Sequence, residues 1–423
     1  MLNKLFDFIN SSPTAHHAIE NIKYTLTTLG FTELYEGDEW QLTAGGKYFV
    51  IKNGTSLIAF KYNPDAKGYM ICASHSDTPA FRLKTNPNRK CGVYTSLSVE
   101  KYGGMIHYSW LDRPLSLAGR VMVNTEGGIS SRLVNIDRDI LSVPSVAIHM
   151  NRSVNDGVAL NAKKDMLPLF SLKEDSDVYS LIASYAGCER DDIIATDIFL
   201  YNRERARTFG EDGEFILSPR LDNLSCVFAS LTAFAAAENS SAIPVLAVFD
   251  NEEVGSETKQ GAASTFLPSV LRRVSGSEDM LDRMLSQSFM VSADNAHAMH
   301  PNSPELADSN NAPTLGGGVV IKYNANQRYT TDALSDAVFR KICEGVKVQS
   351  FCNRADMIGG STLGSIANTK LSVPTIDIGL PQLAMHSATE TAAVSDLYEM
   401  LAALDAFYRA SISVKGRFIK LDV

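Results

Sequence analysis

The order of apolar segments along the chain constrains its fold more than any other sequence feature. Stretches with helical periodicity alternate with short apolar runs of strand length, and the run Gly68–Ala73 is apolar on both faces. We expect helices over Leu2–Ile9, over a second stretch ending at Gly30, and over Asp222–Glu238, Thr331–Glu344 and Ser395–Ala410. We expect strands over Lys47–Ile51, Leu57–Tyr62, Gly68–Ala73, Ile243–Phe249, Phe289–Ala293, Gly318–Lys322 and Val373–Ile378. This alternation predicts an α/β fold with a mainly parallel sheet and helices on both of its faces.

The pattern changes between about Pro87 and Arg207. Here short β-rich segments are separated by Gly, Asp, Asn and Pro, and we expect strands over Val93–Val99, Met105–Trp110, Gly119–Asn124 and Ser145–Ile148. We therefore predict a discontinuous main domain, residues 1–86 and 211–423, with a second, β-rich domain inserted at residues 87–210.

Charge and composition exclude several classes of protein. With 39 basic and 48 acidic residues the net charge is −9, which offers no general attraction for nucleic acid or an anionic membrane. The charge-free stretch in the most apolar helix candidate, Asn223–Ala237, is shorter than the roughly 20 residues that span a membrane. The first residues do not resemble a secretory signal, and the six cysteines form no CxxC pair. We expect a cytoplasmic protein that binds neither nucleic acid nor membrane.

Polar residues that could carry chemistry follow several of the predicted strands. In a parallel α/β sheet, ligands bind at the carboxyl ends of the strands. The candidates at these ends are His75 and Asp77 after Gly68–Ala73, Glu252 and Glu253 after Ile243–Phe249, Asp294 after Phe289–Ala293, Asp222 at the start of a predicted helix, and His386 after Val373–Leu380. We expect these two histidines and several carboxylates to meet at one edge of the sheet.

Such a group of residues favours a metal site. Carboxylates crowded at the end of a buried strand repel one another and lose solvation, and two divalent cations would compensate both effects. Zinc accepts imidazole and carboxylate together, although cobalt or manganese are possible substitutes in such a site. Within the doublet Glu252-Glu253 one residue can bind metal while the other handles a proton, and Asp77 is placed to orient His75.

Five ordered segments resemble the M18 family of aspartyl aminopeptidases. They are SHSDTPAFRLK (Ser74–Lys84), SPRLDNL (Ser218–Leu224), FDNEEVGSETKQGA (Phe249–Ala262), SADNAHAMHPN (Ser292–Asn302) and PQLAMHSATE (Pro381–Glu390). The resemblance implies a site with two zinc ions in which His75 is a ligand, Asp222 bridges both ions, Glu253 and Asp294 each bind one, His386 completes the set, Glu252 is the general base and Asp77 supports the site.

The resemblance also extends to the predicted insert. The segments Tyr102–Val121 and Val143–Arg152 are similar to the dimerisation domain of the family, in which His149 matches a histidine that a neighbouring subunit contributes to the active site. The family also implies dimers that assemble into a tetrahedral dodecamer. Lys322 is either a surface lysine or, as the family suggests, the cation that receives an acidic substrate side chain.

Some of these features have simpler explanations. Asp222 could be a helix N-cap, and Glu252-Glu253 a solvated loop doublet. The spacing of His297 and His300 imitates a ligand pair, but both are expected to have packing or supporting roles, and His16 and His17 to be surface or packing residues. The glycine triplet at 316–318 precedes a strand and lacks the pattern of a phosphate loop. We therefore expect a turn in which the backbone lies close to a neighbouring segment.

The preferred interpretation is a zinc aminopeptidase with two metal ions that removes N-terminal residues from short peptides. In this mechanism the metals activate a bridging water and Glu252 acts as general base; by family resemblance the preferred N-terminal residues are Asp and Glu. Two alternatives remain open: a zinc amide deacylase or carboxypeptidase that uses the same metal site, and a non-catalytic assembly scaffold.

Overall fold

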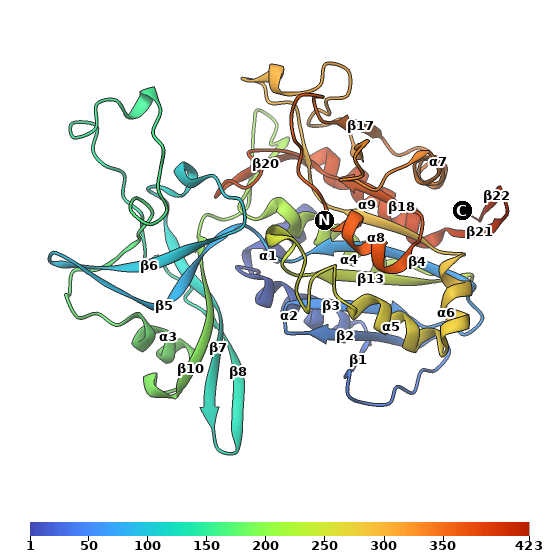
Figure 1. The fold of residues 1–423 in the computed structure, drawn as a ribbon, viewed down its shortest axis with the longest axis horizontal. Coiled ribbons are helices and arrows are strands. Elements are labelled where there is room, and N and C mark those ends of the chain that lie inside the picture. Colours follow the sequence, from blue (N-terminus) through green and yellow to red (C-terminus); the bar gives the residue numbers. More distant parts are fainter. Residues whose placement is uncertain (423) are drawn as a thin grey trace.

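A nine-stranded sheet forms the centre of the computed structural model, which describes residues 1–422 (Figure 1). The strands lie in the order β1-β2-β3-β13-β4-β14-β18-β16-β17. Their bounds are β1 Thr32–Leu34, β2 Lys47–Lys52, β3 Ser56–Lys61, β4 Gly68–His75, β13 Ala242–Phe249, β14 Phe289–Ala293, β16 Val319–Tyr323, β17 Val348–Cys352 and β18 Thr375–Gly379. The central strands β13, β4, β14 and β18 are parallel, whereas β2–β3, β3–β13 and β16–β18 are antiparallel pairs. The predicted α/β fold is therefore confirmed.

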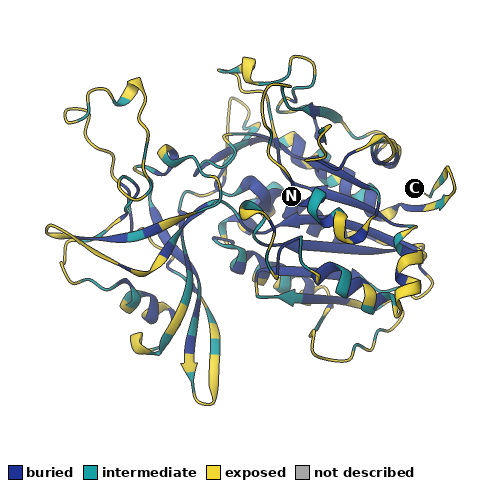
Figure 2. Cartoon of the chain, viewed as in Figure 1, coloured by how far each residue is buried: buried dark blue, intermediate teal, exposed yellow. Residues whose placement is uncertain are grey.

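Helices cover both faces of this sheet. One face carries α1 Leu2–Asn10, α2 Ala15–Thr28, α4 Leu221–Ala236, α7 Ala333–Ile342 and α9 Val394–Arg409, and the other carries α5 Phe266–Ser275, α6 Glu278–Leu285 and α8 Leu363–Leu371. β4 shows why both faces are covered, because its Met70 and Cys72 enter one hydrophobic core while Tyr69, Ile71 and Ala73 enter the other. Figure 2 shows the resulting buried centre. Within residues 1–422, no helix combines the length and hydropathy that crossing a membrane requires.

A second, antiparallel sheet projects from the main sheet on the left of Figure 1. It has the strand order β8-β7-β10-β5-β6-β9. The bounds are β5 Ala80–Cys91, β6 Tyr94–Tyr102, β7 Leu115–Thr125, β8 Gly128–Asn135, β9 Leu169–Ser171 and β10 Ile193–Asn202. With α3 (Val178–Ala186) these strands enclose a separate hydrophobic core, in which the rings of Phe81 and Trp110 meet edge to face at 5.3 Å. β5 begins at Ala80, before the predicted start of the insert at residue 87.

Smaller elements complete the fold. A five-stranded sheet joins β11 Arg207–Phe209, β12 Phe215–Ser218, β20 Glu390–Ala393, β19 Pro381–Leu383 and β15 Ala296–His297, and a C-terminal hairpin joins β21 Ser411–Lys415 and β22 Phe418–Asp422. Short 3-10 turns are η1 His107–Trp110, η2 Val154–Asp156, η3 Arg190–Asp192, η4 Glu252–Val254 and η5 Pro304–Leu306. η4 and the β19–β20 turn border the site described below.

Two predicted strands of the insert are wrong. Met105–Trp110 forms a bend and the turn η1, because the backbone N–H of Ile106 donates to His386 O in another segment and not to a neighbouring strand. Ser145–Ile148 is an exposed irregular segment. There the Asp112 carboxylate accepts hydrogen bonds from the Ser145 backbone and hydroxyl, so a side chain replaces the strand partner that the sequence pattern predicted.

Candidate active site

Three neighbouring strands bring predicted residues to one edge of the main sheet. β4 lies between β13 and β14, and all three run in the same direction, so their carboxyl ends meet. His75 ends β4 and lies opposite Phe249 of β13, Glu252 and Glu253 follow β13 in η4, and Asp294 directly follows β14. The sheet topology thus assembles residues that are far apart in the chain.

Two further side chains reach this edge from other elements. Asp222 lies in the first turn of α4, where its backbone is not helical, and His386 lies in the turn between β19 and β20. The N-cap position of α4 is held by Arg220 and not by Asp222, and Asp222 Oδ1 is buried with no hydrogen-bond partner among the described residues. The N-cap alternative for Asp222 is therefore wrong.

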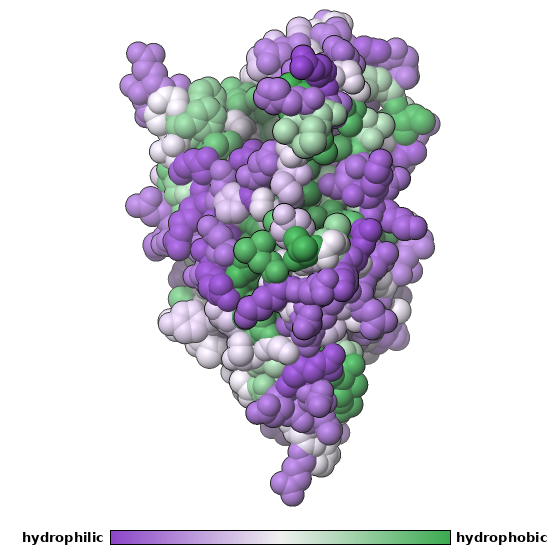
Figure 3. All heavy atoms as spheres, turned by 90° about the vertical axis from the view of Figure 1, so that its left-hand side faces the viewer, coloured by the Kyte–Doolittle hydropathy of each residue, from purple (hydrophilic) through white to green (hydrophobic). Residues whose placement is uncertain are grey.

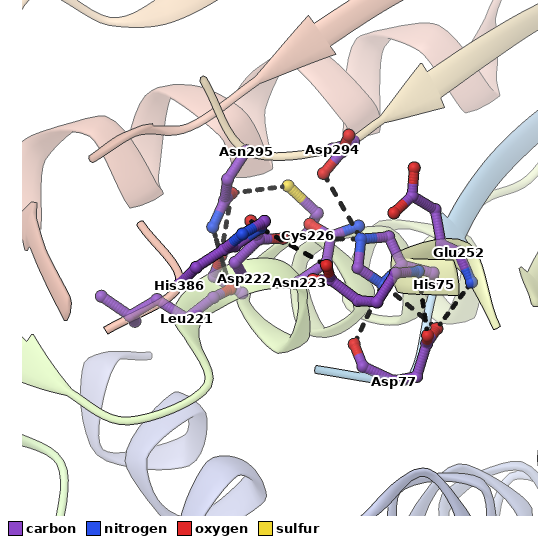
Figure 4. A network of polar contacts seen from close by, with 12 residues as sticks. His75, Asp77, Leu221, Asp222, Asn223, Cys226, Glu252, Asp294, Asn295 and His386 are labelled. Carbon is purple, nitrogen blue, oxygen red and sulfur yellow. Dashed lines mark hydrogen bonds and ion pairs between the residues drawn. The ribbon is translucent and has the colours of Figure 1, made fainter. Parts of the chain in front are cut away.

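Five of the predicted side chains form two groups that share Asp222. Figure 4 labels four of them, His75, Asp222, Asp294 and His386. The first group is His75, Asp222 and Asp294, and the second is Asp222, Glu253 and His386; in each, the possible ligand atoms lie within 4.8 Å of one another. Asp222 Oδ1 is 3.4 Å from His75 Nε2, while Asp222 Oδ2 is 3.6 Å from His386 Nε2. The two oxygens of one carboxylate thus face two different histidines.

The charges of this cluster shift several pKa values strongly. Burial lowers the pKa of His75, but the carboxylates of Asp222 and Asp294, each with an oxygen 3.4 Å from Nε2, outweigh burial and raise it well above its usual value. Burial and the charge of Asp222 raise the pKa of Glu253. For His386, burial is outweighed by Asp222 and Glu253, which raise its pKa to about 10. Apart from the Lys322 ammonium beside Asp294, the carboxylates are therefore balanced by protons on their neighbours when no metal is bound, which is the condition that a divalent metal relieves.

The residues present fit a divalent metal. Asp222 Oδ1 and Glu253 Oε1 are both buried without a hydrogen-bond partner among residues 1–422, an arrangement that costs about 1–3 kcal/mol or more per group unless a ligand satisfies it. Imidazole nitrogens and carboxylate oxygens are the donors that zinc takes in catalytic sites. The cluster is thus a candidate metal centre.

Asp77 contacts both the backbone of the Glu252-Glu253 doublet and the imidazole of His75. Its carboxylate accepts hydrogen bonds from the backbone N–H groups of Glu252 (3.2 Å) and Glu253 (3.1 Å) and from the hydroxyl of Tyr102 (2.6 Å). His75 Nδ1 donates to the backbone oxygen of Asp77 at 3.0 Å and lies 3.4 Å from its Oδ1. Tyr102 was not identified from the sequence, although it opens one of the segments that resembles the family.

Glu390 is a second residue that the sequence did not identify. It is buried, and its carboxyl group accepts hydrogen bonds from the backbone N–H groups of Asp222 (3.0 Å) and His386 (2.8 Å). Burial and the charge of Asp222 raise its pKa to about 8. Glu390 is the last residue of the segment PQLAMHSATE, so its presence in a motif was the available signal.

Glu252 faces the same cavity and belongs to neither group that contains Asp222, but with His75 and Glu253 it forms a third group whose possible ligand atoms lie within 4.8 Å of one another. It lines a pocket of about 110 Å³ together with His75, Asp294 and Lys322. Burial raises its pKa to about 8. The doublet is therefore not a solvated loop, and the two glutamates occupy different positions around the cluster.

Lys322 is buried at the base of this pocket, so the alternative of a surface lysine is wrong. Its side chain is 2 % exposed, and Nζ donates to Asp294 O (2.7 Å) and Asn295 O (3.0 Å). The Asp294 carboxylate lies 3.5 Å from Nζ. Burial lowers the pKa of Lys322, but Asp294 outweighs burial and raises it, so the ammonium keeps its charge.

The remaining histidines lie outside the cluster. His149 is on an exposed loop of the insert and does not line the pocket of its own chain. His297 lines the pocket, and its ring centroid lies 6.1 Å from that of Phe351. His297 and His300 are both exposed residues. His16 is buried elsewhere, between the two sheets.

Comparison with known proteins identifies the same family that the sequence motifs resemble, and the match extends over nearly the whole chain. Residues 8–408 match the family model described as aminopeptidase I zinc metalloprotease (M18). A probable M18 family aminopeptidase 2 of Clostridium acetobutylicum is 43% identical, with 96% of this chain and 98% of that protein covered. Ape4, in a cryo-EM structure with Nbr1, is 36% identical with a TM-score of 0.92, covering 96% of this chain and 85% of that one. The mApe1 dodecamer of S. cerevisiae is 27% identical with a TM-score of 0.85, covering 96% of both chains.

These findings define the class of protein as a zinc metallopeptidase that hydrolyses peptides from the amino terminus. Its α/β fold and its cluster of imidazole and carboxylate groups agree with that class. The chain belongs to the M18 family of aminopeptidases.

Proposed function

We propose that this chain is an aminopeptidase with two zinc ions per subunit that removes acidic residues from the N-termini of peptides. The observation that supports this most is the position of Asp222, whose two carboxylate oxygens face His75 and His386 on opposite sides. A carboxylate in that position is suited to bridge a pair of metal ions.

Each ion would have three protein ligands. His75, Asp222 and Asp294 would hold one, and Asp222, Glu253 and His386 would hold the other. When bound, zinc supplies a Lewis acid that polarises the scissile carbonyl and lowers the pKa of water. Cobalt or manganese would suit the same donors.

Glu252 would carry the proton of the reaction. Its carboxyl group lines the pocket and is not needed in either group assigned to the ions, although it lies within ligand distance of His75 and Glu253. It would take the proton of the attacking water and deliver it to the leaving amine as the amide C–N bond breaks. Asp77 would fix this position, because it holds the backbone N–H groups of Glu252 and Glu253.

Lys322 would select acidic substrates. The net charge of −9 gives the chain no general attraction for acidic peptides, so a local cation has to supply it. Lys322 is a buried cation in a pocket lined by carboxylates, and a charge interacts more strongly there than at the surface.

The second sheet would form the contact between subunits, with His149 completing the pocket of a neighbour. Around His149 the loop exposes large apolar side chains, among them Val146 (60 %) and Met150 (78 %), and Tyr108 nearby in the insert is 72 % exposed. Figure 3, which looks onto this side, shows apolar surface within a largely hydrophilic face. A groove of about 590 Å³ lies there, lined in part by Tyr108 and Val146. Such a patch fits a second copy of this chain, and the related mApe1 is a dodecamer.

The proposed compartment is the cytoplasm. The six cysteines of the chain are all free thiols, as in proteins of a reducing environment.

Substrate kinetics together with metal analysis test the proposed function. We expect zinc-containing protein to hydrolyse free-amine Asp and Glu substrates faster than Leu or Ala substrates and to leave N-acylated substrates intact. Hydrolysis of the acylated substrates alone would instead identify a deacylase or carboxypeptidase. Protein that holds no metal and gains no activity with zinc, cobalt or manganese would support the scaffold alternative.

Subunit mixing tests the role of His149. His149→Ala should impair catalysis without loss of metal, and Glu252→Gln should be inactive. When the two inactive proteins exchange subunits, some sites combine an intact metal centre with an intact His149 from a neighbour, so part of the activity should return. Mixed oligomers without activity would contradict a contribution across the interface.

A further inference from the structure

A second cavity lies between the main sheet and the second sheet. Its volume is about 240 Å³, far above the roughly 10–15 Å³ that one water molecule needs. The wall includes Thr55 from the turn between β2 and β3, Asp250 and Gln260 from the loop after β13, and Arg82 and Arg120 from the second sheet. None of the residues that line it also lines the pocket beside the metal ligands. The cavity is therefore distinct from the pocket that contains the metal ligands, although Asp77 and Tyr102, which support the active site, form part of its wall.

Three buried side chains in the wall of this cavity carry polar atoms that have no hydrogen-bond partner among the described residues. Both ring nitrogens of His16 are unsatisfied, and so are Thr55 Oγ1 and Gln260 Oε1. The exposed fractions of these residues are only 6 %, 2 % and 8 %. Burial, with the charge of Arg120, lowers the pKa of His16 to about 3, so its neutral ring offers one donor and one acceptor. Unpaired buried groups of this kind are costly, so they indicate a polar occupant.

The charges around the cavity restrict that occupant. Arg82 and Arg120 both pair with Asp197 on the second sheet. The wall also contains the carboxyl groups of Asp77 and Asp250, which follow β4 and β13. A simple anion would meet these carboxyl groups and a simple cation would meet the arginines, whereas a molecule that carries both charges matches both walls.

We propose that this cavity binds a free α-amino acid, with its ammonium group toward Asp250 and Gln260 and its carboxylate toward Arg82 and His16. The apolar side chains of Ala80 and Phe199 complete the wall and would contact the amino-acid side chain. Free amino acids are also the products of an aminopeptidase, but binding at this site does not depend on the proposed acidic selectivity or on the number of metal ions.

The occupant would lie beside a chain of hydrogen bonds that leads to the active site. Gln260 Nε2 donates to Asn251 Oδ1 (2.9 Å), Asn251 Nδ2 donates to the hydroxyl of Tyr102 (2.9 Å), and Tyr102 donates to Asp77 (2.6 Å). Asp77 in turn holds the backbone of Glu252. The bound amino acid would thus stabilise the junction of the two sheets next to the metal centre.

Calorimetric titration of the zinc-containing enzyme tests this site. The active site is first saturated with an aminoacyl hydroxamate, so that product binding there is blocked, and the probe is L-alanine. We expect one L-alanine per subunit and a rise in Tm as its concentration increases. Propionate lacks the ammonium group and ethylamine lacks the carboxylate, so each should bind at least about tenfold more weakly.

Substitutions locate the binding. His16→Phe keeps the shape of the ring and removes both nitrogens, so it should weaken L-alanine binding at least about tenfold. The matched control is His17→Phe, since His17 is adjacent and does not line the cavity. Thr55→Val removes one unsatisfied hydroxyl with little change of shape and serves as a second variant if His16→Phe does not fold. Absence of L-alanine binding, equal binding of propionate, or unchanged binding in both cavity variants would overturn the proposal.

Discussion

The buried histidine His16 should make the stability of this protein depend on pH in a defined way. His16 is 6 % exposed, and burial, with a smaller contribution from Arg120, lowers its pKa from 6.5 to about 3, although Asp197 acts in the opposite direction. In the unfolded chain His16 regains its ordinary pKa, so the unfolded state binds a proton first as the pH falls. The contribution of neutral His16 to the free energy of unfolding is therefore complete above about pH 6.5 and is lost progressively as the pH falls toward about 3.

The size of this effect follows from the two pKa values. Each pH unit between them changes the free energy of unfolding by about 1.4 kcal/mol, so lowering the pH from about 7.5 to about 5 should remove ~2 kcal/mol through His16 alone. The assay is urea unfolding of the wild-type protein and His16→Phe at both pH values. Other titrating groups are present in both proteins, so the variant should lose ~2 kcal/mol less than the wild type. An equal loss in both proteins would refute the assignment of His16 as a neutral buried group.

Three further substitutions test the active site. Glu252→Gln should lower kcat by orders of magnitude because it removes proton transfer, while metal analysis finds the ions retained; loss of metal would instead make Glu252 a ligand. Lys322→Ala should reduce kcat/KM for Asp and Glu substrates far more than for Leu or Ala substrates, and an equal reduction for all would exclude a role in selectivity. Tyr102→Phe removes the hydroxyl that donates to Asp77 at 2.6 Å, so zinc affinity or activity should fall about 10–100-fold; unchanged zinc titrations and kinetics would show that Asp77 is held without it.

The sequence predicted the main sheet well because burial on both faces leaves a clear pattern. β4 is apolar from Gly68 to Ala73 and its eight residues are all buried, which is the pattern expected of a central parallel strand. The polar residues after β4, β13 and β14 could be placed together because parallel neighbours end at the same edge of a sheet. The predicted grouping of the candidate site residues therefore rested mainly on the parallel topology of the sheet.

The parts that the sequence did not predict depend on contacts between distant segments. Ser145–Ile148 has strand-like residues, but the carboxylate of Asp112 binds its backbone in place of another strand. The supporting roles of Tyr102 and Glu390 depend on hydrogen bonds to residues 25 and 168 positions away. No local pattern of hydropathy or spacing encodes such partners, so only the folded structure reveals them.

The metal content of Asp222→Asn tests the central claim most directly. Purified wild-type protein and the variant are dialysed against zinc-buffered solution. Bound zinc per subunit is then measured by inductively coupled plasma mass spectrometry. If Asp222 bridges two ions, the wild type should hold two and the variant should lose both together, because its neutral amide no longer balances either cation. One fully occupied zinc site in the variant, or a single ion in the wild type, would contradict the account of a bridged metal pair.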